Sequence, residues 1–174
     1  MLDTILDSPL SSWLQLDTDA TDHIVISSRI RLARNFDGVL FTNRNDMSSL
    51  EKVNSFSRSL LKPLKDVDGH QYSNINLEQL SERDRAILEE KLPYRNLVVS
   101  DDASIVIMVN EEDHLRIQSM VSGLRLEVAY ERVLKIDKAI EAKYPYAFDE
   151  RFGYLTACPT NVGTGLRASV MLHL

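Results

Sequence analysis

The sequence has 174 residues and a mass of 19.8 kDa, the size of one domain that can bury a hydrophobic core without disulfides. Its hydrophobic residues (44%) and charged residues (26%) exclude a wholly disordered chain, and its formal net charge of -6 disfavours a non-specific nucleic-acid binder. With one cysteine, no basic signal-peptide start and no apolar run approaching ~18 residues, we expect a soluble cytoplasmic protein without membrane spans, disulfides or direct nucleic-acid contacts.

The first predicted elements are a short helix and a strand. Residues 10–16 have the spacing of a short helix, and a β-branched run from His23 predicts a strand that continues through Ile30. Because successive side chains of a strand alternate between its two faces, Arg29 and Arg31 are expected to point the same way. We therefore expect two guanidinium groups side by side on this strand.

The next region is predicted to be helical. Residues 46–65 carry apolar residues at helical spacing, and Ser48 with Glu51 forms a capping-box pattern near their start. Pro63 is expected to end or kink this helix, since proline lacks the amide hydrogen that a helix interior needs. Residues 77–92 repeat the helical spacing and predict a second helix that stops before a proline.

The second half of the sequence alternates between strand and helix patterns. Residues 110–121 are expected to pass from a strand into a helix, and residues 127–143 give the clearest helix pattern. Runs typical of strands occupy four further segments: 97–99, 104–109, 154–158 and 168–174. Since several of these strands are close enough to form hairpins, we expect an α+β fold with an antiparallel or mixed β-sheet flanked by helices.

The first segment that suggests chemistry is SSRIRLAR, residues 27–34. Two arginines on one strand face can form an anion clamp, because each guanidinium makes paired hydrogen bonds to a phosphate. The alternative is a solvated edge strand, where positive charge discourages pairing with other sheets. Both interpretations fit these residues.

The second segment is NEEDHLRIQSM, residues 110–120. One interpretation is a helix start, with Asn110 as N-cap and three acids facing the positive end of the helix dipole. The other is catalytic, since adjacent carboxylates repel one another and raise the pKa of one of them toward that of a general base. On a helix Arg116 would lie on the same side as Glu112 and Asp113, where it could pair with an acid or bind a phosphate.

The third segment is CPTNVGTGLR, residues 158–167, a loop between two predicted strands. Gly163 and Gly165 permit backbone angles that other residues avoid and allow a ligand to approach closely. The segment lacks the Gly-Lys-Ser/Thr ending of a Walker A loop. Cys158 is either a small buried hydrophobic residue or a reactive thiol, and the glycines form either a simple turn or part of a site.

Together the three segments contain a thiol, three adjacent carboxylates and several arginines, an inventory that suits phosphoryl transfer because that reaction depends on positioning and charge neutralisation. NEEDHLRIQSM and CPTNVGTGLRASV resemble the two signature stretches of the phosphagen (guanidino) kinases, the family of creatine and arginine kinases. SSRIRLAR resembles the family's arginine-bearing nucleotide strand. The short segment before this strand, which contains Ser-Ser-Trp, resembles the start of the bacterial protein-arginine kinases.

The resemblance implies a role for each matching residue. Glu112 matches the base that takes a proton from the substrate guanidinium, and Cys158 matches the reactive cysteine beside that group. The arginines that match ligands of the nucleotide phosphates are Arg29, Arg31, Arg116 and Arg167. The supporting positions are Ser28, Asp113, Asn161 and Gly163.

The resemblance also implies substrates, partners and domain organisation. ATP would arrive with Mg²⁺ held by its phosphates, and no protein ligand for the metal is expected. The acceptors would be arginine side chains of proteins, with a heat-shock repressor and Clp protease components as candidate partners in a stress response, and the chains could form homodimers. Residues 1–174 would form the N-terminal part of a glutamine-synthetase-like catalytic domain, without a helical domain before it and with further parts of the site downstream.

Two other functions are compatible with the same residues. One is a kinase of free arginine or another small guanidino compound. The other is a truncated module that binds a nucleotide or a partner without turnover. An assay with protein and free-arginine acceptors separates the two kinases, and binding of Mg-ATP without transfer would identify the module.

Overall fold

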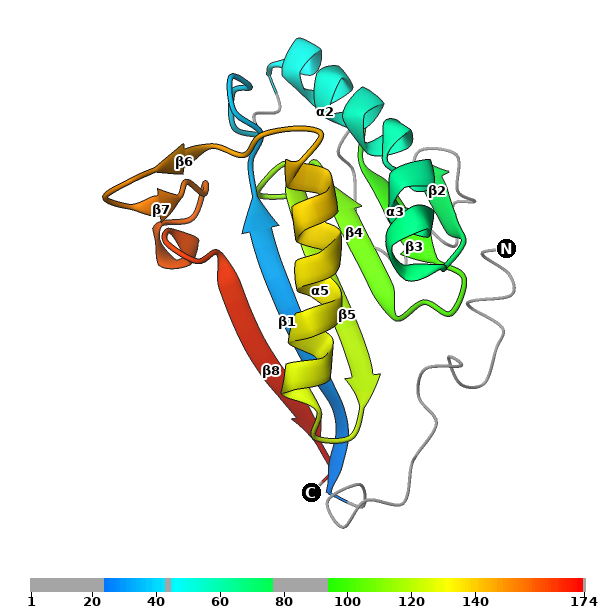
Figure 1. Cartoon of the computed structure of the whole chain (residues 1–174). Helices are drawn as coiled ribbons and strands as arrows, with labels where there is room; N and C mark the ends of the chain where they lie inside the picture. Colours follow the sequence, from blue (N-terminus) through cyan, green and yellow to red (C-terminus); the bar gives the residue numbers. More distant parts are fainter. Residues whose placement is uncertain (1–23, 43–44, 77–93, 174) are drawn as a thin grey trace.

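The computed structural model describes residues 24–42, 45–76 and 94–173, so the helices predicted over residues 10–16 and 77–92 lie outside the described residues. A six-stranded sheet with the order β2-β3-β4-β5-β1-β8 forms the centre of the fold, and each neighbouring pair of strands is antiparallel (Figure 1). Its strands are β1 (Val25–Arg34), β2 (Tyr72–Asn76), β3 (Asn96–Ser100), β4 (Ile105–Val109), β5 (Leu115–Ser122) and β8 (Leu166–Leu172).

The described α-helices pack on this sheet and along its end. They are α2 (Met47–Ser59), α3 (Leu61–Asp68) and α5 (Leu126–Glu141). Figure 1 shows α5 lying across β1 and β5, with α3 near the β2 end of the sheet. The predicted α+β class with flanking helices is therefore confirmed, and the sheet is antiparallel rather than mixed. None of the helices in the described ranges has the length and apolar character that a membrane span requires.

The hydrophobic core lies between the sheet and the helices α2, α3 and α5. The predicted apolar face of this helix is fully buried, since the exposed fraction is 0% for each of its four members: Ala129, Val133, Ile136 and Ile140. On the sheet side, Ile117 and Ile107 pair across β5 and β4 and are equally buried. Burying a side chain of this size contributes about 1.5–3 kcal/mol, so this layer is a major source of stability.

The helical region around residues 46–65 is two helices instead of one. Leu60 separates α2 from α3, and Pro63 lies in the first turn of α3, where its missing amide hydrogen removes no intrahelical bond. The carbonyl of Ser59, four residues before the proline, instead accepts a hydrogen bond from Lys143 Nζ at 3.0 Å. The predicted interruption of this helix is therefore confirmed: the break falls at Leu60, and Pro63 lies in the first turn of the helix that follows.

The N-terminus of α2 is capped by Asp46, which corrects the predicted capping box of Ser48 and Glu51. The carboxylate of Asp46 accepts hydrogen bonds from the backbone nitrogen and the hydroxyl of Ser49, at 3.2 and 2.6 Å. An aspartate at the N-cap accepts a hydrogen bond from a backbone nitrogen of the first turn that has no partner within the helix, as the serine of a capping box does. These bonds lower the pKa of Asp46.

The segment predicted to pass from a strand into a helix is the turn and second strand of a hairpin. Val109 of β4 pairs with Leu115 of β5, and the backbone nitrogen of Asn110 donates to the carbonyl of His114 at 3.0 Å. Asn110 has a φ of 58°, a left-handed conformation that asparagine tolerates better than most residues. From Leu115 onward every second residue is buried against the helices, and this two-residue period prevails over the capping signal.

The predicted strand over residues 154–158 is almost absent. Gly153–Tyr154 forms β7, which pairs with β6 (Phe148–Asp149) in a small separate hairpin, and the chain then turns through a short 3-10 helix, η2 (Pro159–Asn161). Beyond Tyr154 the backbone is held by single contacts, such as that from the nitrogen of Leu155 to the carbonyl of Ala147 at 2.9 Å. This irregular path brings Cys158 to the end of the sheet described next.

Candidate nucleotide and guanidino site

The four predicted phosphate-binding arginines lie on one face of the sheet. Arg31 of β1 is directly opposite Arg167 of β8, and Ala33 of β1 is opposite Arg116 of β5. Residues paired directly across antiparallel strands project to the same side, and alternation along β1 adds Arg29 to this side. The same alternation directs Ile30 and Leu32 to the opposite face, where they are buried against the helices. The face that carries the arginines is named here the arginine face.

The charges of the neighbouring arginines also act on Arg31. Burial and the like charges of Arg116, Arg167 and Arg29 lower the pKa of Arg31, and Glu111 alone opposes them among the main influences. Concentrated positive charge is unfavourable unless an anion neutralises it. The arginine face therefore has the electrostatic character of an anion-binding surface.

Two of the arginines have side-chain partners on this face. The guanidinium of Arg116 forms an ion pair with Glu111, with its Nη1 atom 2.7 Å from Oε1 and 2.6 Å from Oε2. Arg116 thus pairs with an acid, as one of its two expected roles, but its expected placement on a helix beside Glu112 and Asp113 is wrong because Arg116 lies in strand β5. Arg29 donates from Nε to the hydroxyl of Ser169 on β8 at 3.2 Å.

The turn that carries Glu112 is anchored by its neighbour Asp113. The Oδ1 atom of Asp113 accepts hydrogen bonds from Asn35 Nδ2 and from the backbone nitrogen of Ala157, each at 2.7 Å. Asn35 in turn accepts from the backbone nitrogen of His114 at 2.9 Å. One buried carboxylate thus joins the β4–β5 turn to the end of β1 and to the loop before β8.

This anchor places the predicted base and the predicted thiol at one corner of the sheet. The backbone nitrogen of Ala157 donates to the carboxylate of Asp113 at 2.7 Å. Glu112 is the residue before Asp113 and Cys158 is the residue after Ala157, so this hydrogen bond holds the two close together. Glu112 is exposed, whereas Cys158 is half-buried with its Sγ atom 3.0 Å from Thr160 Oγ1. A carboxylate and a thiol at one edge of an arginine-rich surface can receive a cationic group beside a bound polyphosphate.

The remaining predicted residues support the backbone. Asn161 belongs to η2, where its backbone nitrogen donates to the carbonyl of Cys158 at 3.0 Å. Gly163 has a φ of 109° and exchanges two backbone hydrogen bonds with Tyr154, at 2.8 and 3.2 Å. Ser28 is fully buried on the helix side, where its hydroxyl donates to the carbonyl of Gly123 at 2.7 Å and accepts from a backbone nitrogen. Ser28 therefore does not join the arginine face.

The sequence patterns did not single out four residues that shape this corner: Arg34, Asn35, His114 and Asp137. Alternation places Arg34 on the face opposite Arg29 and Arg31, where it forms a buried ion pair with Asp137. A signal for this pair was present, since an acid at position 137 interrupts the apolar face of the helix predicted over residues 127–143. Asn35 and His114 act through contacts between distant segments that no local pattern reports.

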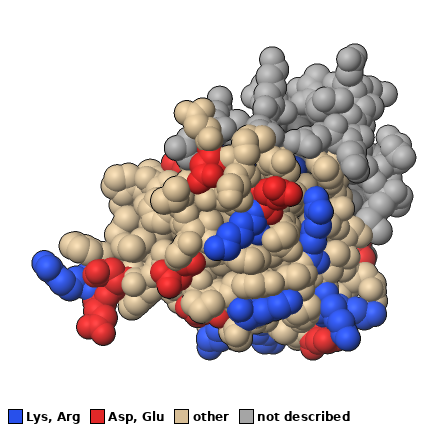
Figure 2. Space-filling view, turned by 90° about the horizontal axis from the view of Figure 1, so that it is seen from above, with Lys and Arg blue, Asp and Glu red and all other residues tan. Residues whose placement is uncertain are grey.

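The molecular surface near this end of the sheet carries charges of both signs. Figure 2 shows basic side chains beside one another in the middle of the view, with acidic side chains among them. The small β6–β7 hairpin projects to one side in Figure 1, and it carries the charged residues Asp149, Glu150 and Arg151 at the end of β6 and in the turn.

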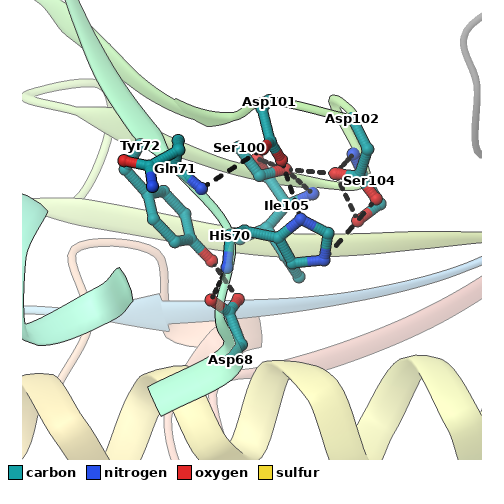
Figure 3. Close-up of polar contacts among 9 residues, drawn as sticks. All are labelled: Asp68, His70, Gln71, Tyr72, Ser100, Asp101, Asp102, Ser104 and Ile105. Carbon is teal, nitrogen blue, oxygen red and sulfur yellow. Dashed lines mark hydrogen bonds and ion pairs between the residues drawn. The ribbon is translucent and has the colours of Figure 1, made fainter. Parts of the chain in front are cut away.

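A cluster at the other end of the sheet contains three groups of the kind that bind metals. His70, Asp101 and Asp102 place potential ligand atoms within 4.8 Å of one another (Figure 3). Both ring nitrogens of His70 face carboxylates, with Nδ1 2.8 Å from Asp101 and Nε2 3.7 Å from Asp102. Partial burial alone would lower the pKa of His70, but the hydrogen bond to Asp101 and the charges of Asp102 and Asp68 raise it overall. The geometry favours a protonated imidazole that links β2 to the β3–β4 turn.

His114 has the opposite environment. Its Nδ1 atom accepts a hydrogen bond from the backbone nitrogen of Phe36 at 3.0 Å, so Nε2 carries the hydrogen and donates to the carbonyl of Leu40 at 2.7 Å. The ring is fully buried and stacks on Phe36 at 5.9 Å between centroids. Burial lowers the pKa of His114, and therefore the folded protein holds this ring neutral.

The two histidines predict opposite effects of pH on stability. His114 contributes stability that is complete above about pH 6.5 and is lost as the pH falls. At the lower pH the imidazole of His114 is protonated in the unfolded chain but stays neutral in the folded protein. His70 contributes stability below about pH 6.5 that is lost as the pH rises through its elevated folded pKa. Each contribution changes by at most about 1.4 kcal/mol per pH unit.

Urea denaturation between pH 5 and pH 8 tests both signs with two matched variants. The difference in unfolding free energy between wild type and His114→Gln should shrink on acidification, whereas the difference for His70→Gln should shrink as the pH rises. Taking differences cancels the groups that titrate alike in both proteins. Differences that stay constant across this range would contradict the assigned charge states.

Comparison with known proteins agrees with this geometry. Residues 37–174 match the family described as ATP:guanido phosphotransferase, C-terminal catalytic domain. The class of protein that the antiparallel sheet and its arginine face define is therefore established: the chain belongs to the ATP:guanido phosphotransferase family. The resemblance to phosphagen kinases predicted from the three segments is confirmed.

The curated relatives point to one branch of this family. The chain is 44% identical to the protein-arginine kinase of Syntrophomonas wolfei, over 94% of its own length and 48% of that protein. It is 40% identical to the protein-arginine kinase of Halothermothrix orenii, over 99% of its length and 51% of that protein. The chain therefore spans about half the length of the curated relatives it matches.

Solved structures share the fold. A taurocyamine kinase from Schistosoma mansoni with bound transition-state-analogue components superposes with a TM-score of 0.73 and 29% identity, over 94% of this chain and 26% of that one. A lombricine kinase superposes with a TM-score of 0.71 and 25% identity, over 95% of this chain and 54% of that one. Both neighbours are named as kinases, in agreement with the family.

Proposed function

We propose that the protein of which this sequence forms part transfers the γ-phosphoryl group of Mg-ATP to arginine side chains of proteins. The observation that carries the proposal is the arginine face beside the corner that holds Glu112 and Cys158. The naming of the curated relatives as protein-arginine kinases supports a protein acceptor. Mg²⁺ enters as part of the nucleotide substrate and requires no ligand from these residues.

The proposed reaction assigns a step to each group. A guanidinium stays protonated at neutral pH and is not a nucleophile until it loses a proton, so the Glu112 carboxylate accepts that proton. The freed nitrogen then forms a bond to the γ-phosphorus while the bond from this phosphorus to the β,γ-bridging oxygen breaks, and ADP leaves with the electron pair. Cys158, as a thiolate, would orient the substrate cation.

The arginine face supplies charge stabilisation. Arg29, Arg31, Arg116 and Arg167 would neutralise the triphosphate and the negative charge that spreads over the transferring group. Because these guanidinium groups are held by paired strands, they need little reorganisation when the reaction occurs.

An acceptor assay tests the proposal. The complete gene product is incubated with Mg-ATP labelled at the γ-phosphate and with either an unfolded protein rich in arginine or free arginine. Products are analysed at neutral to alkaline pH, because a phosphorus–nitrogen bond of this kind is labile in acid. Transfer to the protein is expected. Transfer to free arginine alone would support the small-guanidine kinase instead, and labelling of neither acceptor would refute the kinase proposal.

Loss of single arginines should weaken nucleotide binding. Arg29→Ala and Arg167→Ala each remove a charge-assisted contact, for which the expected increase in the dissociation constant of Mg-ATP is roughly 10- to 100-fold. Isothermal titration calorimetry measures this change. Arg132→Ala, which removes an exposed arginine from α5 on the other side of the sheet, is the control and should leave the constant unchanged. Equal effects of all three variants would contradict a local phosphate site.

The resemblance in sequence supports more specific partners. We propose that the acceptors include a heat-shock repressor and Clp protease components, within a cytoplasmic stress response, and that the active form is a homodimer. We also propose that residues 1–174 constitute the N-terminal part of one catalytic domain. Phosphoarginine mapping in cells with and without the gene tests the acceptors.

A further inference from the structure

Arg34 ends β1 on the helix-covered side of the sheet, and its side chain is only 4% exposed. It forms a two-pronged ion pair with Asp137 of α5, with Nε 3.0 Å from Oδ1 and Nη2 2.8 Å from Oδ2. A planar guanidinium matches a carboxylate in this way, whereas a lysine ammonium does not. The pair therefore fixes both the position and the plane of the guanidinium.

The rest of this guanidinium holds the loop that contains Cys158. Its Nη1 atom donates to the carbonyl of Ala33 and to that of Thr164, each at 2.9 Å. Its central carbon lies 3.8 Å from the centre of the Tyr154 ring, a close cation–π contact. Tyr154 and Thr164 lie on either side of the segment that contains Cys158, so one buried side chain grips both ends of this loop.

Gly165 shows how closely the loop packs against Arg34 and the end of β1. Its carbonyl accepts a hydrogen bond from the backbone nitrogen of Ala33 at 2.8 Å, and its φ is 63°. A Cβ atom at this position would lie 2.5 Å from the carbonyl oxygen of Ala33 and 2.6 Å from Arg34 Nη1. Only glycine permits this conformation and this approach together.

From these contacts we infer that Arg34 is a positioning residue, which holds the Tyr154–Thr164 loop so that Cys158 stays beside the turn of Glu112. Arg34 touches neither predicted reactive group and acts from the opposite face of the sheet. Because the loop also leads into β8, the same grip sets the start of the strand that carries Arg167. The inference rests on the proposed function for its catalytic consequence, but the position of the loop can be measured independently.

The thiol of Cys158 reports on the loop directly. In the complete gene product, alkylation of Cys158 by iodoacetamide is followed by mass spectrometry of the peptide that contains it. Arg34→Lys keeps the positive charge but loses the planar guanidinium that pairs with Asp137. We expect this variant to change the alkylation rate at least threefold and to reduce the kcat of transfer at least tenfold. Its dissociation constant for Mg-ATP should stay within threefold of the wild-type value. Arg132→Lys, the same substitution on the exposed side of α5, should alter none of these values.

A second variant keeps the test decisive if Arg34→Lys fails to fold. Tyr154→Leu removes the stacked ring but leaves the ion pair with Asp137, and it should change the alkylation rate in the same direction. A rate within twofold of wild type in every variant that folds would overturn the inference. If the wild-type protein shows no transfer activity while Arg34→Lys clearly changes the alkylation rate, the positioning role stands and the proposed function is refuted instead.

Discussion

Glu112→Gln in the complete gene product is expected to lower the rate of phosphoryl transfer by about 10²- to 10⁴-fold, the range that a positioned general base contributes. Glutamine keeps the shape of the side chain but cannot accept the proton of a guanidinium. Glu112 makes no hydrogen bond or ion pair among the described residues that holds the fold together, and it is exposed, so stability should change by less than about 0.5 kcal/mol.

The measurement separates chemistry from binding. Initial rates with a protein acceptor are compared with the Mg-ATP dissociation constant, which should remain close to the wild-type value because the phosphates meet the arginine face. Glu131→Gln, an exposed acid on α5, is the matched control and should retain full activity. Turnover by Glu112→Gln near the wild-type rate would remove this residue as the base.

Asp113→Ala is expected to affect both stability and activity. The substitution leaves the backbone nitrogen of Ala157 and the amide of Asn35 without the carboxylate that now accepts from both at 2.7 Å. A buried donor without a partner costs about 1–3 kcal/mol, so a loss of roughly 2–4 kcal/mol in unfolding free energy is expected. Because the turn and the loop then lose their connection, transfer should also fall.

A milder variant distinguishes the hydrogen bonds from the charge. Asp113→Asn retains an oxygen that can accept from both donors, and it should lose no more than half as much stability as Asp113→Ala. Urea denaturation gives these free energies, and the rate of Cys158 alkylation follows the loop. If the two variants are equally destabilised, the charge and not the paired hydrogen bonds holds the corner together.

Local patterns predicted the parts of this protein that depend on neighbouring residues. The four buried positions of α5 follow from a 3.6-residue period, and the shared face of Arg29 and Arg31 follows from strand alternation. The position of Arg116 beside them depends on the pairing of β5 with β1, which brings together residues far apart in the sequence. The resemblance to a family predicted the role of Arg116, because no local pattern in the sequence indicates which strands pair.

The errors have one physical origin. Asn110 followed by acids is a good helix start in isolation, yet the pairing of Val109 with Leu115 makes it a hairpin turn. The side chain of Asn110 instead donates to the carbonyls of Leu50 and Tyr94, at 2.9 and 3.0 Å. Tertiary contacts decide between two local structures that such a sequence allows, and the same holds for Arg34, whose partners come from α5 and the loop before β8.

The order of strands in the sheet has a consequence for folding. Strands β3, β4 and β5 are joined by short turns and can pair early, whereas β1 must wait for contacts such as that of Arg29 with Ser169, 140 positions later. The arginines of β1, β5 and β8 are therefore expected to meet only in the last steps of assembly. A ligand that needs all of them binds only the fully formed sheet. Nucleotide added during refolding would therefore stabilise the folded state by mass action.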